Sequence, residues 1–257
     1  MADPPDRSMR RTRLAEADLR AAWVEHASEF IAWAQRPGHD SYWRFHRDQF
    51  LELVPPPGRR TLDLGCGEGR LSRDLTRLGH AVVAADASEA MIAAARKADP
   101  GIEAHVADAA ALPFADGGFD LVVAFMSLQD MDDLEGAVAE AARVLEPGGR
   151  LCIAIVHPIN SAGEFRGGDP GSPFVIAASY LDRSYYADDI ARDGLEITFV
   201  SAHRPLQAYT DAITGAGLLI DRLREPSVPD EAIVTPRNRR WQRLSLFPHL
   251  RAVKPAA

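Results

Sequence analysis

The sequence predicts an α/β domain built on a doubly wound, mostly parallel β-sheet. Three observations favour this fold class. From residue 60 onward short apolar segments alternate with segments of helix length, a glycine-rich turn directly follows the first apolar segment, and aspartates end the second and third. Strands separated by helix-length segments are joined by right-handed crossovers, which produce parallel strands. We expect the 257 residues to form a single domain.

The region before the sheet, residues 14–54, predicts two helices that lie over the site. The second carries Tyr42 among other aromatic and apolar residues at helical spacing, and Pro55-Pro56-Pro57-Gly58 ends it. The predicted sheet core spans residues 58–158. Its strands are expected at 61–64, 81–85, 102–107, 119–125 and 151–156.

Composition and charge narrow the classes of function. The net charge of −8 disfavours nucleic acid as a partner, although Arg237-Asn238-Arg239-Arg240 forms a local basic cluster. Cys66 and Cys152 are too few for a disulfide framework and lack metal-ligand spacing, so we expect two buried, reduced thiols and no metal. No stretch approaches the ~20 apolar residues of a membrane helix. We therefore expect a cytoplasmic protein without membrane contact, and the Arg-rich, Ala-rich composition favours a bacterial source.

The ligand site is expected where the carboxyl ends of the strands meet. The turn at 65–69 has the spacing Gly-x-Gly-x-Gly, which differs from the Gly-x-Gly-x-x-Gly that binds a dinucleotide pyrophosphate. At the end of the second strand, Asp86 can accept both hydroxyls of a ribose, and at the end of the third Asp108 can accept from an exocyclic purine amine. This combination predicts a nucleoside pocket without a phosphate requirement.

Residues 60–158, roughly two-fifths of the chain, resemble the class I S-adenosylmethionine-dependent methyltransferases. The motifs that carry the resemblance occur in the family's order and at its usual separations. They are Leu62-Asp-Leu-Gly-Cys-Gly-Glu-Gly69, Ala84-Ala-Asp86-Ala-Ser88, Val106-Ala-Asp108-Ala, Leu112-Pro-Phe114, Phe119-Asp-Leu-Val-Val123 and Arg143-Val-Leu-Glu-Pro-Gly-Gly-Arg150.

The resemblance implies which residues bind the adenosine part of S-adenosyl-L-methionine. Asp86 would hold the ribose hydroxyls, and Ala87 and Met91 would pack near the adenine. Asp108 and the amide of Ala109 would recognise the edge of the adenine.

The resemblance also implies residues for the methionine part. The turn Gly65-Cys66-Gly67 would approach it through the backbone, and Phe125 would offer its carbonyl to the amino group. Asp63 would support that amino end indirectly. Arg70 would either meet the methionine carboxylate or form a surface salt bridge.

A seven-stranded sheet with an antiparallel final strand pair is a further implication of the resemblance. Residues 205–254 fit it with a helix at 205–217 and strands at 218–223 and 244–253. Residues 159–204 between the fifth strand and that helix predict a small β-rich insertion, a candidate lid over the substrate.

Four residues are candidates for the acceptor side of the site. His157 ends the fifth strand before Pro158 and is the candidate general base, or else it hydrogen-bonds the lid. Tyr42, Gln129 and His203 are candidates for substrate contact, with core packing, the polar end of a strand and a cap as the respective alternatives.

The favoured function is methyl transfer to an oxygen or nitrogen atom of a small molecule, and the bacterial composition favours a specialised metabolite. Methylation of tRNA, rRNA or a protein side chain is the alternative. A nicotinamide-dependent oxidoreductase has the wrong glycine spacing, and the aspartates at the strand ends argue against a binding module without activity. The acceptor and the oligomeric state stay open.

Overall fold

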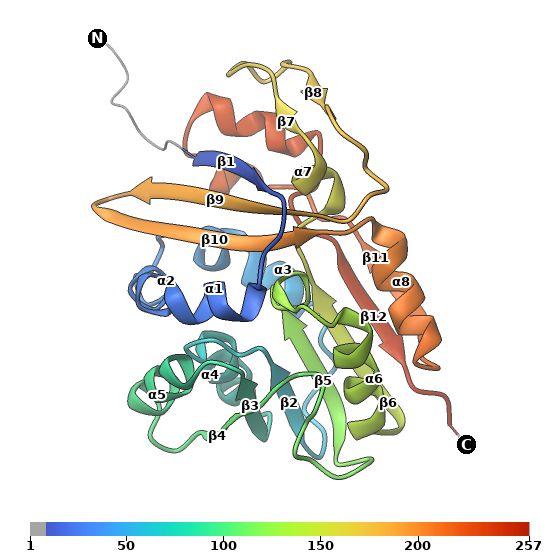
Figure 1. Ribbon diagram of the computed structural model, residues 1–257. Coiled ribbons are helices and arrows are strands. Elements are labelled where there is room, and N and C mark those ends of the chain that lie inside the picture. The colour runs from blue at the N-terminus through green and yellow to red at the C-terminus, as the bar shows by residue number, and fades with distance from the viewer. Residues whose placement is uncertain (1–8, 257) are drawn as a thin grey trace.

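A seven-stranded sheet forms the centre of the protein (Figure 1), whose computed structural model describes residues 9–256. Its strand order is β11-β12-β6-β5-β2-β3-β4. Strands β2 to β6 run parallel to one another, and β12 lies antiparallel to both of its neighbours, β6 and β11. Their bounds are β2 Thr61–Leu64, β3 Val82–Asp86, β4 Glu103–Val106, β5 Phe119–Phe125, β6 Leu145–Ala154, β11 Leu219–Arg224 and β12 His249–Val253. The predicted fold class, including the antiparallel final pair, is confirmed.

Four helices connect these strands: α4 (Arg70–Arg77), α5 (Glu89–Ala98), α6 (Leu134–Val144) and α8 (Leu206–Gly215). Polar side chains begin two of them. Ser88 accepts a hydrogen bond from the amide of Met91 at the start of α5, and Asp133 accepts from Gly136 at the start of α6. Such caps satisfy amides that the helix itself leaves without partners.

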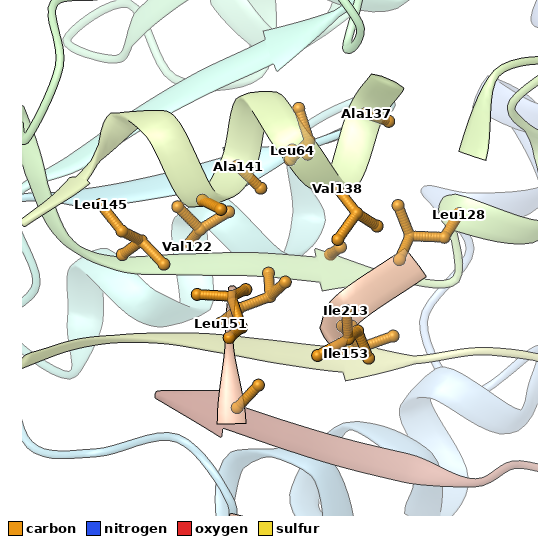
Figure 2. Packing of buried hydrophobic residues seen from close by; sticks show 14 of the residues in the cluster. Leu64, Val122, Leu128, Ala137, Val138, Ala141, Leu145, Leu151, Ile153 and Ile213 are labelled. Carbon is orange, nitrogen blue, oxygen red and sulfur yellow. The ribbon is translucent and has the colours of Figure 1, made fainter. Parts of the chain in front are cut away.

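The main core lies between the sheet and α6 and α8. Figure 2 shows Val122 of β5 and Ile153 of β6 against Val138 and Ala141 of α6 and Ile213 of α8, all fully buried. A second cluster of buried residues, on α3 (Arg47–Leu51), α4, β5 and β6, includes Phe50 and Leu75. β5 is thus buried on both faces, as its continuous apolar run predicts. Both cysteines are buried and unpaired.

The N-terminal region differs from the two predicted helices. It contains β1 (Met9–Leu14), α1 (Leu19–Glu25), α2 (Ala27–Ala34), a short π-helix η1 (Tyr42–His46) and α3. Gly38 separates α2 from η1 with a φ of 73°, a left-handed conformation that cannot continue a helix. β1 was not predicted, and it pairs with a strand more than 170 residues later in the chain, Arg11 lying opposite Asp188.

A second sheet, in the order β1-β9-β10, lies across the end of the main sheet (Figure 1). β9 (Ser184–Arg192) and β10 (Leu195–His203) form a long hairpin in the segment predicted as a β-rich insertion. Helix α2 contacts β10 on one side and α5 on the other. The same segment contains α7 (Pro158–Ala162) and the short pair β7 (Glu164–Phe165) and β8 (Phe174–Val175).

The remaining short helices are η2 (Leu128–Asp130), η3 (Asp230–Ala232) and η4 (Pro236–Gln242). In the part of the chain that the structure describes, no helix is long and apolar enough to cross a membrane.

Candidate active site

A cavity of about 650 Å³ lies at the carboxyl ends of β2, β3, β4 and β5, beneath α1, α2 and the β9–β10 hairpin. Every residue predicted to bind the cofactor lines it. These are Asp63, Gly65, Cys66, Gly67, Arg70, Asp86, Ala87, Met91, Asp108, Ala109 and Phe125. The structure therefore brings together side chains and backbone from the ends of four strands in one space.

In the turn at 65–69, the structure leaves little room for a side chain at Gly65 and Gly67. Gly65 has a φ of 73°, and a Cβ on it would lie 2.4 Å from the Cβ of Ser127. A Cβ on Gly67 would lie 3.1 Å from the ring of Phe30. The amides of Gly65 and Cys66 both donate to the carbonyl of Ala85, which ties the turn to β3. The turn thus packs tightly against its neighbours, and its backbone at Gly65 and Gly67 forms part of the cavity wall.

Asp86 fixes this turn from the end of β3. Its carboxylate accepts from the amide of Gly67 and from the amide of Ser88, both at 2.9 Å. Burial raises the pKa of Asp86, and the two amides oppose that shift. The carboxylate therefore organises the loop and faces the cavity at once.

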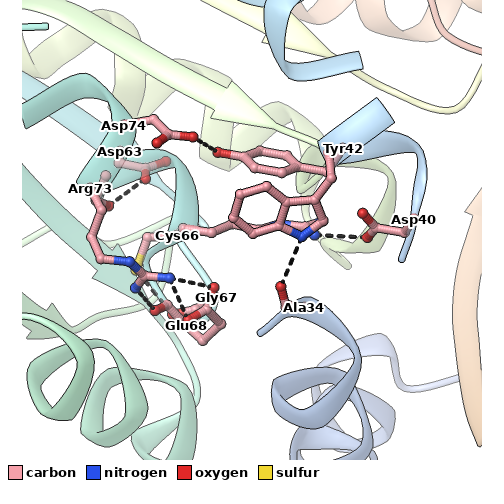
Figure 3. A network of polar contacts seen from close by, with 12 residues as sticks. Ala34, Asp40, Tyr42, Asp63, Cys66, Gly67, Glu68, Arg73 and Asp74 are labelled. Atoms are coloured by element: carbon pink, nitrogen blue, oxygen red, sulfur yellow. Dashed lines mark hydrogen bonds and ion pairs between the residues drawn. The ribbon is translucent and has the colours of Figure 1, made fainter. Parts of the chain in front are cut away.

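Asp63 is buried beneath the turn and accepts a hydrogen bond of 2.5 Å from the hydroxyl of Ser72. Burial raises its pKa to about 7, against the effect of the Ser72 hydrogen bond. Glu68, which the sequence analysis did not single out, is also buried, and Arg73 pairs with both of its carboxylate oxygens at 2.9 and 2.8 Å (Figure 3). This pair closes the turn onto α4.

Arg70 forms an ion pair with Asp40 at 2.7 Å, and both side chains are only 13% exposed. Its guanidinium lies 4.2 Å from the centre of the Tyr42 ring. The pair is thus largely buried at the cavity wall, and it is not the surface salt bridge that was considered. Asp108 meets Arg20 at 3.0 Å, with both side chains about half exposed at the mouth of the cavity.

Aromatic side chains from α1, α2 and β10 form one wall of the cavity. Trp23 lies edge-on to Phe30 at 5.2 Å, and Phe199 lies 6.2 to 6.4 Å from Trp23, Trp33 and Phe30. Aromatic residues of the N-terminal helices were expected at this site, and Phe199 lies in the segment 159–204 predicted as a β-rich insertion. Its contact with Trp23 could not be read from spacing.

Tyr42 and His46 line the cavity from η1. The hydroxyl of Tyr42 donates to Asp74 at 2.7 Å (Figure 3), and burial together with Asp74 raises the pKa of Tyr42. His46 stacks on Phe247 with ring centres 3.7 Å apart, and its Nε2 lies 3.1 Å from Nε2 of His249. Burial lowers the pKa of His46, so its imidazole is neutral.

Beyond β5 the chain turns sharply into η2. Met126 has a φ of 57°, a strained conformation for a residue with a side chain. Gln129 lines the cavity, and its amide nitrogen donates to the carbonyl of Met126 at 2.6 Å and to Asp130 at 2.9 Å. Its amide oxygen is buried without a hydrogen-bond partner among the described residues.

Two predicted histidines lie elsewhere. Nδ1 of His157 accepts from the amide of Ile159 and caps α7, while its Nε2 meets Glu225 at 2.6 Å. His157 lines a separate, shallow pocket together with Glu225. The ring of His203 contacts the hydroxyl of Ser161 at 2.7 Å and the carbonyl of Tyr180 at 2.9 Å.

Neither histidine lines the large cavity, so the positions correct the prediction of His157 as general base and of His203 as a substrate contact. Because Pro158 begins helix α7, the imidazole of the preceding residue turns back onto that helix and away from the strand end.

Residues 62–153 match the family model described as a methyltransferase domain. The chain is 39% identical over 117 residues to a demethylmenaquinone methyltransferase of Beutenbergia cavernae. The aligned segment covers 46% of this chain and 48% of the relative. It is 38% identical over 117 residues to the protein of that name from Corynebacterium glutamicum (strain R), with coverages of 46% and 49%. The chain thus spans about half the length of the curated relatives it matches.

Among solved structures, an S-adenosylmethionine-dependent methyltransferase from Mesorhizobium loti superimposes with a TM-score of 0.68 and 25% identity, covering 83% of this chain and 98% of that one. The cyclase SpnF shares the fold, with a TM-score of 0.60, 19% identity and coverages of 95% and 98%. The domain match, the Mesorhizobium loti structure and the seven-stranded sheet together identify a class I S-adenosylmethionine-dependent methyltransferase domain in this chain.

Proposed function

We propose that this protein works in the cytoplasm and transfers the methyl group of S-adenosyl-L-methionine to an oxygen or nitrogen atom of a small molecule. One observation carries the proposal: a single cavity joins the glycine turn and Asp86 to the aromatic wall of Trp23, Phe30 and Phe199. The first part suits a nucleoside, and the second suits a compact apolar acceptor.

The residues at the strand ends fit the cofactor. A Cβ on Gly65 would collide with the side chain of Ser127, so glycine is required there, and the backbone of the turn at Gly65 and Gly67 lines the cavity where the methionine part of the cofactor would lie. The carboxylate of Asp86 would hold the ribose, Asp108 with the amide of Ala109 would hold the adenine, and Asp63 would support the amino end. When bound, S-adenosylmethionine supplies a methyl group that its sulfonium already activates.

The chain's own contribution is to position the reactants and to exclude water. Eight aspartates and four arginines line the cavity. This acidic balance suits a ligand that carries a positive charge. The aromatic wall covers the glycine turn directly, since Phe30 lies against Gly67.

A small acceptor agrees better with the site than a macromolecule does. The curated relatives named above are demethylmenaquinone methyltransferases, which supports a small-molecule acceptor. In the basic cluster in η4, which could have favoured RNA, Asp230 offsets the charge of Arg239, and the guanidinium of Arg240 lies over the ring of Phe165. Methylation of RNA or protein stays as the second candidate.

Two measurements test the proposal. By isothermal titration, S-adenosylmethionine and S-adenosylhomocysteine should bind in the micromolar range, and NAD should not bind. With S-adenosylmethionine labelled in its methyl group and a fractionated bacterial extract, label should enter the small-metabolite fraction. Label in the RNA or protein fraction would support the second candidate, and tight NAD binding without a response to the sulfonium compound would overturn both.

A further inference from the structure

Asp130 is a carboxylate that lines the cavity on the acceptor side. One of its oxygens accepts from the hydroxyl of Ser201 at 2.5 Å, and the other accepts from the amide nitrogen of Gln129 at 2.9 Å. In the part of the chain that the structure describes, it forms no ion pair. Each of its oxygens therefore keeps a lone pair for a further donor.

A second unused acceptor lies beside it. The amide oxygen of Gln129 is buried and has no hydrogen-bond partner within residues 9–256. A buried polar atom without a partner is costly, and such atoms are usually satisfied by a ligand or water. The pair Gln129 and Asp130 thus presents hydrogen-bond acceptors to a molecule that brings donors.

The groups that face Asp130 come from α1, β9, α8 and the residue after β10. Burial raises the pKa of this carboxyl, and Trp23 on α1 lowers it by directing its indole N–H toward the carboxylate. Arg204, directly after β10, uses its guanidinium on the carbonyls of Met131 at 2.6 Å and Gln129 at 3.4 Å. Burial raises the pKa of Tyr186 on β9 and of Tyr209 on α8, and Asp130 raises the pKa of both phenols further, so both are uncharged. Arg204 is consequently the one charge among these groups.

The pKa of the Asp130 carboxyl lies near neutral pH. Burial raises its pKa to about 7, although Ser201, Gln129 and Arg204 act in the opposite direction. A carboxyl with such a pKa can take up a proton at neutral pH and release it again.

Other ionisable groups on the acceptor side already form ion pairs or hydrogen bonds within the protein. Asp188 is paired with Arg11 at 2.8 and 2.7 Å. His46 is held against His249, and the hydroxyl of Tyr42 donates to Asp74.

We infer that Asp130 is the general base of methyl transfer and that the acceptor carries a proton on its reacting nitrogen or oxygen. The inference rests on the function proposed above. The lone pair of the acceptor atom forms the bond to the methyl carbon, and the carbon–sulfur bond breaks with its electron pair remaining on sulfur. The proton of the acceptor passes to a carboxylate oxygen of Asp130, which later releases it to solvent.

Binding of sinefungin and of S-adenosylhomocysteine can test the position of Asp130 even when the acceptor is not identified. Sinefungin has a protonated amine where the methyl sulfonium would be, and S-adenosylhomocysteine has no charge there. A base that reaches the acceptor atom must lie near this amine. Asp130→Asn should therefore weaken sinefungin about tenfold and change S-adenosylhomocysteine less than twofold, by isothermal titration at pH 8. The matched control is Asp211→Asn, which removes an exposed carboxylate from α8 and should change neither.

The unmodified protein gives an independent readout if the variant does not fold. Its affinity for sinefungin relative to S-adenosylhomocysteine should rise between pH 5.5 and 8, as Asp130 loses its proton near pH 7. Asp63 has a similar pKa, but it acts on the methionine end that both ligands share, so it cancels in the ratio. A ratio that is independent of pH, or an Asp130→Asn variant that weakens both ligands equally, would overturn the inference. Failure of both ligands to bind would instead contradict the proposed function.

The labelled product separates the two acceptor types. A methylated amine that can lose its charge is retained on a cation exchanger at neutral pH and released at high pH, and a methyl ether passes through; both outcomes support a base, and Asp130→Asn should lower either yield at least a hundredfold while cofactor binding persists. A product that stays bound at high pH is a quaternary ammonium; because its tertiary amine precursor has no proton to lose, that result would overturn the role of Asp130. Label that mild alkali releases as methanol would mark a methyl ester. Because a carboxylate loses no proton when it is methylated, that result would overturn the role of Asp130.

Discussion

The two halves of the cavity are built in different ways. The cofactor half consists of the turn at 65–69, Asp86 and Asp108, which follow three successive strands of the sheet. The acceptor half consists of Trp23, Phe199 and Asp130 with their neighbours, from α1, β10 and η2. Neighbouring segments of the chain make the first, and segments far apart in the chain make the second.

This difference extends to the atoms that face the cavity. In the cofactor half the backbone of the turn lies directly against side chains, so that one additional carbon on Gly65 would collide with Ser127. In the acceptor half, side chains make the wall, and their loss leaves the backbone in place. The comparison therefore predicts large effects for small changes in the first half.

Gly65→Ala should cause the largest loss. The new Cβ would lie 2.4 Å from Ser127, and alanine is strained at a φ of 73°. We expect the affinity for S-adenosylhomocysteine to fall at least about a hundredfold by isothermal titration.

The matched control for this change is Gly38→Ala. Gly38 has the same φ of 73° with nothing within 4 Å of the added carbon, so it carries the strain without the collision. Equal losses of affinity in both variants would attribute the effect to backbone strain and would weaken the comparison.

Asp86→Asn should cause the next largest loss of affinity for S-adenosylhomocysteine. The carboxylate accepts from two amides and would also accept from the ribose, and hydrogen bonds to a charged group contribute about 1.5 to 3 kcal/mol each. An amide retains the shape but loses the charge and one acceptor, so S-adenosylhomocysteine should bind about ten- to hundredfold more weakly. Glu103→Gln, on the adjacent strand β4 and paired with Arg60 outside the cavity, is the control. Binding within twofold of the parent would remove Asp86 from the ribose site.

The same difference explains what could be predicted from the sequence. The spacing of the glycines and the position of Asp86 and Asp108 at strand ends follow directly from strand and helix periodicity, and all of these residues line the cavity. The antiparallel end of the sheet, in contrast, was expected from the resemblance to the methyltransferase family, and residues 205–254 fit it. Local rules suffice where neighbouring segments make the structure.

The acceptor half could be predicted only in part. Tyr42 and Gln129 line the cavity as expected of substrate contacts, whereas His157 and His203 do not. The end of a strand determines where a residue lies but not where its side chain points. The side chain of His157 points back onto α7 because it caps that helix. Asp130 was not singled out, because its partner Ser201 lies 71 residues later in the chain.

Asp63 in the cofactor half and Asp130 in the acceptor half share one property, a raised pKa. Burial raises the pKa of each to about 7, above the value of an unfolded chain. The folded protein then binds more protons than the unfolded chain between about pH 4 and 7, so each group lowers the stability as pH rises through this range. Above pH 7 the effect is constant.

Asp63→Asn should remove one such group. Relative to the parent, the variant should gain stability from pH 5 to pH 7 by up to about 1.4 kcal/mol per pH unit, the slope for a single proton. Urea unfolding at pH 5, 6, 7 and 8 measures this, and Asp211→Asn serves as the control because its carboxylate is exposed. A difference between variant and parent that is the same at all four pH values would contradict the assignment.

His157→Ala should give the smallest effect and the sharpest contrast with Asp130. His157 caps α7 through Nδ1 and pairs with Glu225, whose side chain is 57% exposed. Loss of a cap costs about 1 kcal/mol and loss of an exposed pair less than that, so the free energy of unfolding should fall by about 1 kcal/mol. S-adenosylhomocysteine binding and the yield of labelled product should stay within twofold.

His157→Asn is the control, because an asparagine oxygen can accept from the amide of Ile159 and should restore most of the stability. If His157→Ala instead abolished methyl transfer while the protein remained folded, an imidazole outside the large cavity would matter for the chemistry. The acceptor half would then extend to the pocket beside Glu225, and the division of the site into these two halves would be wrong.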